Sequence, residues 1–151
     1  MLNKISATIT EDKKAEFKEI AARLKALLPF MISLTSEERK RGMRLGLQSL
    51  SFIGKALEYA EANPQFTSEY IKIDEFHRDY KVAYDMIELY RLLHPLVQQM
   101  KDTAMQAATE ALPQAISFYA SVGSAVSKGE EGASEIHDEL RDLFPGRNLN
   151  S

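Results

Sequence analysis

The feature that most constrains this chain is a run of apolar residues, spaced three and four apart, that continues from Phe76 to Val122. In its first half the run forms two apolar stripes, and both keep their register through Pro95. A loop at the proline would reset the phase of these stripes. The pattern therefore predicts a long helix that is kinked at Pro95 and continues beyond it.

The length of this run predicts a turn further along. Unbroken, the helix would be about 78 Å long at 1.5 Å per residue, and the helix predicted before it could cover about half of that. Three places for the turn are open: Pro95, the polar residues 101–103, and residues 109–113. We favour a turn between Lys101 and Pro113, which would bring two halves of the run side by side.

Capping signals set the bounds of two earlier helices. Thr10 precedes two acidic residues, which predicts a helix from Glu11 to Leu28 that Pro29 then ends. Thr35 and Glu38 have the spacing of a capping box, which predicts a second helix from residue 36 to residue 62. Apolar residues cover about two-thirds of this second helix, so it is expected at the centre of the fold.

The composition agrees with an all-α fold. The chain has 17 Leu and 17 Ala but only 4 Val, which favours residues that lose little entropy in a helix. Residues 70–73 are strand-like but have no partner strand, so they are expected to form an extended connection. With a short last helix over residues 133–143, we predict one helical domain over residues 1–151. It would be a bundle of four to five helices, with flexible ends at 1–10 and 147–151.

Three glycines of the second predicted helix, Gly42, Gly46 and Gly54, each cost about 1 kcal/mol of helix propensity. Two interpretations are open. Either a neighbouring backbone comes very close there, with the alanine-rich residues 104–115 as the matching surface or as a self-association face, or the packing is ordinary and the glycines are incidental. Close packing predicts that leucine is more damaging at Gly46 than at Gly132.

Charge and composition exclude several classes of function. The 19 basic and 22 acidic residues give a net charge of −3, which disfavours nucleic-acid binding. The chain has no Cys, and no Glu-x-x-His motif of the di-iron bundles occurs. We therefore predict no metal site, no cofactor and no catalytic residue. Without an apolar run of membrane-spanning length or a signal-peptide core, a cytoplasmic protein with no membrane partner is expected.

Three residues are candidates for binding a small ligand: Tyr90, His94 and Tyr119. His94 lies on an apolar stripe one helical turn after Tyr90, and tyrosine combines a ring that packs with a hydroxyl that needs a partner. The favoured alternative makes His94 a buried neutral side chain bonded to a backbone carbonyl freed at Pro95. In that alternative the tyrosines are ordinary core residues.

The basic residues Arg41 and Arg44 are candidates for an interaction surface, because they belong to the densest cluster of positive charge. The alternative is a solvated helix end in which Glu37 pairs with Arg41. The remaining histidines, His77 and His137, are expected on solvated faces.

Several stretches together resemble a known group of proteins. Residues Leu34–Met43 and Ala56–Pro64, with Phe118-Tyr119 and the terminal Leu143–Gly146, are similar to small all-helical bacterial proteins of unknown function. The resemblance implies a bacterial, cytosolic, helical protein. It implies no activity and no ligand residues.

Two functional hypotheses follow. The favoured one is a non-enzymatic helical bundle that acts through protein–protein contacts or self-association as a homo-oligomer. The alternative is a small-molecule binder or enzyme that uses a Tyr/His-lined pocket between helices. An exposed apolar stripe supports the first hypothesis, and a closed pocket with converging Tyr and His groups supports the second.

Overall fold

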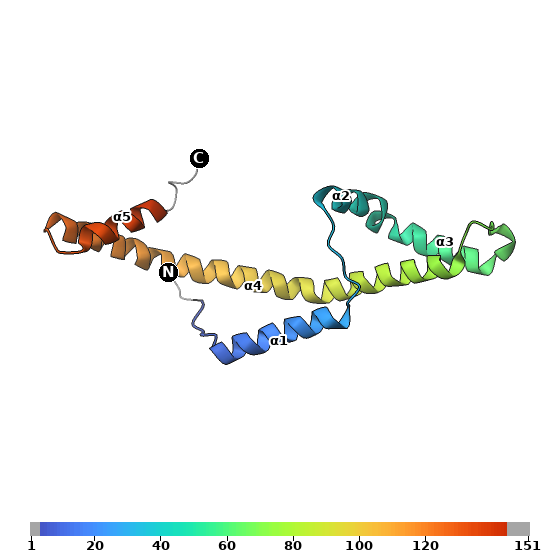
Figure 1. Cartoon of the computed structure of the whole chain (residues 1–151), viewed down its shortest axis with the longest axis horizontal. Helices are drawn as coiled ribbons and strands as arrows, with labels where there is room; N and C mark the ends of the chain where they lie inside the picture. Colours follow the sequence, from blue (N-terminus) through green and yellow to red (C-terminus); the bar gives the residue numbers. More distant parts are fainter. Residues whose placement is uncertain (1–3, 145–151) are drawn as a thin grey trace. The chain divides into compact units, whose positions relative to one another are not determined.

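The computed structural model describes residues 4–144, apart from the side chains of Arg44 and Leu45. Within that part the protein is all-α and contains no strand, which confirms the predicted fold class (Figure 1). The predicted flexible end at 147–151 lies outside the described residues. Along the chain, the elements are α1 (Glu11–Leu27), α2 (Ser36–Leu45), the 3₁₀ turn η1 (Leu47–Ser49), α3 (Leu50–Ala62), the 3₁₀ turn η2 (Pro64–Phe66), α4 (Ile73–Ser127) and α5 (Ala133–Leu143).

The first two helices begin where their capping residues predict. The Thr10 hydroxyl accepts a hydrogen bond from the Lys13 backbone N–H over 3.3 Å, which starts α1. At the start of α2, Thr35 and Glu38 form the complete capping box. The Thr35 hydroxyl accepts from the Glu38 N–H at 3.2 Å, and the Glu38 carboxylate accepts from the Thr35 N–H at 2.8 Å. Side chains thus satisfy backbone donors that a helix start leaves unpaired.

The prediction of one unbroken helix over residues 36–62 is wrong, because the helix is interrupted at Gly46. Gly46 has φ −100° and ψ −74°, and a short 3₁₀ turn separates it from α3. A Cβ atom at this position would lie 2.9 Å from the carbonyl oxygen of Gly42, so glycine permits a backbone that a side chain would strain. Gly46 therefore marks a break in the helix and not a close contact with a neighbouring helix.

The predicted turn between Lys101 and Pro113 is also wrong. Helix α4 continues through both Pro95 and Pro113. Hydroxyl side chains support its backbone along this stretch, since Thr103 donates to the Gln99 carbonyl at 2.7 Å and Thr109 donates to the Met105 carbonyl at 2.8 Å. These threonines bond backwards within the helix and do not cap a new one.

Contacts within the chain divide the described residues into two units, and each is described by itself. The N-terminal unit comprises residues 8–97, and the C-terminal unit comprises residues 4–7 together with 98–144. The single-domain organisation stays a prediction.

In the C-terminal unit, a tight turn reverses the chain after α4. Gly129 has φ +73°, and the N–H groups of Gly129 and Glu130 donate to the carbonyls of Val126 and Ala125 at 3.0 and 3.1 Å. This pattern is a Schellman motif, which satisfies the last carbonyls of a helix. It returns α5 onto α4, where Val122 is buried.

In the N-terminal unit, α3 packs against the first part of α4. Leu57 is 4% exposed, and a Cβ on Gly54 would lie only 2.5 Å from the Tyr80 hydroxyl. Gly54 is thus a site of close packing, with Tyr80 as the neighbour and not the alanine-rich residues 104–115. The second apolar stripe of this helix stays open, because Phe52 is 75% exposed. The predicted central position of the helix is therefore wrong.

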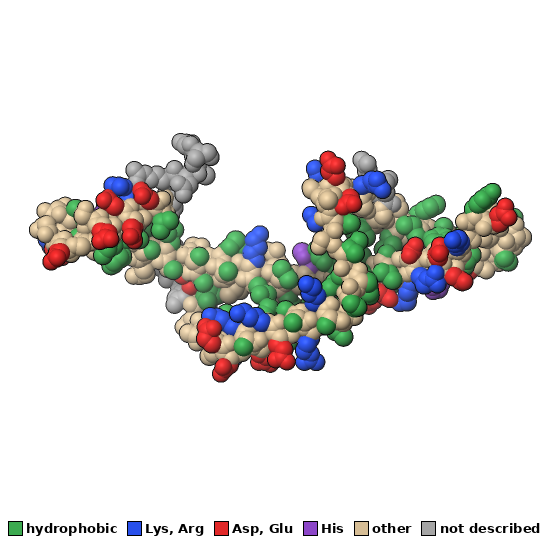
Figure 2. All heavy atoms as spheres, viewed as in Figure 1, with side chains coloured by type: hydrophobic (Ala, Val, Ile, Leu, Met, Phe, Trp, Pro, Cys, Tyr) green, Lys and Arg blue, Asp and Glu red, His purple; other side chains and the backbone are tan. Residues whose placement is uncertain are grey.

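Apolar side chains are widely exposed in both units. Among the described residues, three apolar side chains are buried: Leu57, Val122 and Ala133. By contrast, 33 large apolar or aromatic side chains are exposed. Figure 2 shows hydrophobic side chains at the surface of several helices. A functional site of this protein is therefore expected on its exposed apolar surfaces.

Candidate functional site

An apolar groove, here named the α1–α4 groove, lies in the N-terminal unit. It has a volume of about 620 Å³ and is formed by the end of α1, the extended segment that follows, and one stretch of α4. Its lining residues are Ala21, Leu24, Lys25, Leu27, Leu28, Met31, Ile32, Ser33, Leu89, Leu92 and Leu93.

Helical spacing and one proline place these residues around the groove. Leu24 and Leu28 lie one turn apart on the apolar stripe of α1, and Pro29 follows where the helix ends. A turn then redirects the chain, with the Met31 N–H donating to the Leu28 carbonyl at 3.2 Å. The apolar residues after the turn thus lie on the same groove as the end of α1.

The groove is apolar and its rim projects into solvent. Among the described residues that line it, Lys25 alone carries a charge. Leu27, Ile32 and Leu92 are 72%, 81% and 69% exposed. A site that encloses a small molecule buries most of the ligand between its walls. Here the walls are themselves exposed, so the groove is suited to receiving a larger apolar surface.

Tyr90 and His94 lie together on α4, as their four-residue spacing predicts. The Tyr90 hydroxyl and His94 Nδ1 are 3.0 Å apart, and the ring centroids are separated by 5.1 Å. Both side chains are exposed, so the expected buried His94 bonded to a backbone carbonyl near Pro95 is wrong. Their role as ligand-binding residues stays a prediction.

Tyr119, the third candidate, belongs to the C-terminal unit and has partners of its own there. Its ring stacks on His137 with centroids 4.8 Å apart and an angle of 15°, and it contacts Phe144 at 5.2 Å. The His137 side chain is 28% exposed, so its expected place on a solvated face is wrong. The imidazole ring lies beside Gly123, where a Cβ would be in ordinary van der Waals contact with it at 3.8 Å. The stack holds α5 on α4.

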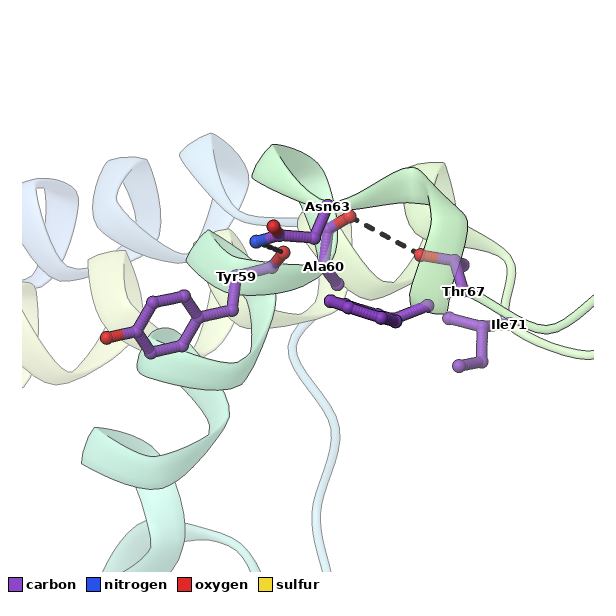
Figure 3. A pocket seen from close by; sticks show the side chains of 6 residues that line it. Tyr59, Ala60, Asn63, Thr67 and Ile71 are labelled. Carbon is purple, nitrogen blue, oxygen red and sulfur yellow. Dashed lines mark hydrogen bonds between the residues drawn. The ribbon is translucent and has the colours of Figure 1, made fainter.

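A second hollow lies at the end of α3 and is shown in Figure 3. Its polar groups are used by the helix end. The Asn63 amide donates to the Tyr59 carbonyl at 2.9 Å, and the Thr67 hydroxyl donates to the Ala60 carbonyl at 3.4 Å. These bonds satisfy carbonyls that a helix end leaves unpaired, so the polar groups serve capping. The exposed Phe66 beside them, 82% accessible, adds to the open apolar surface.

The basic cluster of α2 is partly structural. The Arg39 guanidinium donates to the Leu34 carbonyl at 3.0 Å, at the entrance of the helix. Arg41 is exposed, and the predicted Glu37–Arg41 ion pair is absent among the ion pairs of the described residues. The side chain of Arg44 lies outside the described part of the structure, and the interaction surface stays a prediction.

Hydrogen bonds at the surface shift the pKa of two carboxyl groups. A bond from the Thr35 backbone N–H lowers the pKa of Glu38 below its usual 4.5. Bonds from the Gln106 amide, and then from the backbone N–H of Lys4, lower the pKa of Glu110 below the same value. These bonds support a helix start and a chain-end contact, and both carboxylates lie outside the α1–α4 groove.

The pKa of Lys81 is raised above its usual 10.5, mainly by its hydrogen bond to Asp85. That bond is 2.6 Å long and joins two residues one turn apart on α4. His77, expected on a solvated face, reaches from α4 to α3, where its Nδ1 lies 2.7 Å from the Glu61 carboxylate. These polar contacts hold local structure together in the N-terminal unit.

Sequence reasoning missed the α1–α4 groove, although two signals pointed to it. Leu92 lies on neither of the two apolar stripes of its helix, so it is an extra apolar residue without a predicted neighbour. The residues after Pro29 are apolar but belong to no predicted helix, and Met31 and Ile32 among them line the groove.

The described residues contain no group of three or more His, Cys, Asp or Glu side chains that could hold a metal ion. None of the described helices combines the length and apolarity needed to cross a membrane. No family model, curated protein or solved structure matches this chain. Its function has to be argued from its own surfaces.

Proposed function

We propose that this protein is a non-enzymatic helical protein that works as an assembly of its own copies. The observation that carries the proposal is the imbalance between three buried apolar side chains and 33 exposed large apolar or aromatic ones among the described residues. A single soluble chain rarely exposes contiguous apolar surface without a partner.

Non-enzymatic action is proposed because the α1–α4 groove is apolar and open, and because the hollow at the end of α3 has its polar groups engaged. The α1–α4 groove has one charged lining residue among those described, and the polar groups at the end of α3 are used for capping. A bacterial and cytoplasmic setting belongs to the same proposal, and it rests on the resemblance to small helical bacterial proteins.

Sedimentation velocity of the full-length chain over a wide range of protein concentration tests the proposal. We expect a dimer or larger assembly at micromolar concentration, and a melting temperature that rises with concentration because dissociation accompanies unfolding. A folded monomer at every concentration, with a concentration-independent melting temperature, would contradict self-association.

A further inference from the structure

We draw no further inference here: the strongest candidate, the apolar α1–α4 groove of the N-terminal unit, carries nothing because nothing in the structure shows what covers it.

Discussion

Within the N-terminal unit, α4 meets two neighbours in different ways. Against α3 it is closely fitted, with Leu57 buried, Gly54 lying directly against Tyr80, and Glu61 bonded to His77. Against the end of α1 it leaves the α1–α4 groove, whose rim is mostly exposed. The contact with α3 is closely packed, whereas the contact with the end of α1 leaves apolar side chains exposed to solvent.

The difference shows what a small side chain does in each contact. On the α3 side, a glycine removes one side chain so that a tyrosine ring can approach the helix. On the α1 side, most residues that line the groove are large and aliphatic, and no glycine lies among them. A close contact between two helices thus differs from an open groove in the size of the residues where the helices meet.

The largest effect is expected from truncating a leucine on each side of this comparison. Leu57→Ala should lower the free energy of unfolding by about 2–5 kcal/mol at every protein concentration, because it leaves a cavity in a packed contact. Leu24, 42% exposed at the groove, is the matched position. Leu24→Ala should lower the free energy of unfolding much less, because this side chain is already partly in contact with solvent. Chemical denaturation measures both variants, and equal losses would break the comparison.

A smaller loss is expected when the glycine of the fitted side is replaced. Gly54→Leu must displace the Tyr80 ring, since even a Cβ would lie 2.7 Å from its Cζ atom, and the expected cost is about 1–3 kcal/mol. The control is Gly42→Leu in α2, where a Cβ meets nothing within 4 Å and the gain in helix propensity should stabilise slightly. Thermal unfolding measures both. A Gly54 variant as stable as the Gly42 variant would show that the tyrosine is free to move.

The sequence predicted where helices begin better than it predicted which helices contact each other. Caps are local, so Thr10 and the Thr35–Glu38 box located two helix starts correctly. The break after Gly46 is a short 3₁₀ turn, which helix propensity alone does not predict. The turn expected before Pro113 failed because it rested on an assumption that a long helix must be covered by its own chain. That assumption does not hold for a helix that leaves apolar surface exposed.

The candidate site was predictable only in part, and for a related reason. The four-residue spacing correctly predicted that Tyr90 and His94 meet, because that contact lies within one helix. The groove needs the end of α1 and a segment of α4 that lies far along the chain, and apolar periodicity does not say which stripe meets which. Close packing at Gly54 was one of two open interpretations, and its neighbour Tyr80 was not predicted, for the same reason.

In the C-terminal unit, backbone conformation, and not the space around the residue, makes one glycine position sensitive to substitution. Gly132 has φ +79°, a region that costs other residues about 1–2 kcal/mol. Its substitution is therefore strained although its surroundings are open. A Cβ at Gly46 would lie 2.9 Å from the Gly42 carbonyl oxygen, so both positions resist a side chain, and their predicted order stays a prediction. Gly132→Ala should destabilise the chain by about 1–2 kcal/mol in thermal unfolding. If Gly132→Ala leaves the melting temperature unchanged, the packing of α5 on α4 does not depend on this glycine.

The smallest effect on stability is expected at a polar contact in the C-terminal unit. It contrasts with the larger losses expected from changes to apolar packing. The Glu110 carboxylate accepts hydrogen bonds from the backbone N–H groups of Lys4 and Ile5 at 2.8 and 3.2 Å, and from the Gln106 amide at 2.7 Å. These bonds lower its pKa below 4.5. In Glu110→Gln a neutral amide accepts these bonds less strongly, so hydrogen exchange of the Lys4 and Ile5 amides should become faster while the melting temperature hardly changes.

The pH dependence of the same contact has a defined sign. Because the folded pKa of Glu110 is lowered, the unfolded chain takes up a proton first as the pH falls below about 4.5. The contribution of Glu110 is therefore fully present above that pH and is lost as the pH falls through the lower folded value. Wild-type protection of the Lys4 and Ile5 amides should decline in that range, and in Glu110→Gln it should be low and independent of pH there. Glu16→Gln, which removes an exposed carboxylate on α1, is the control for the change in net charge. If both variants keep the wild-type pH dependence, the carboxylate does not hold the chain end. Stabilisation of this unit would then rest on its apolar contacts alone.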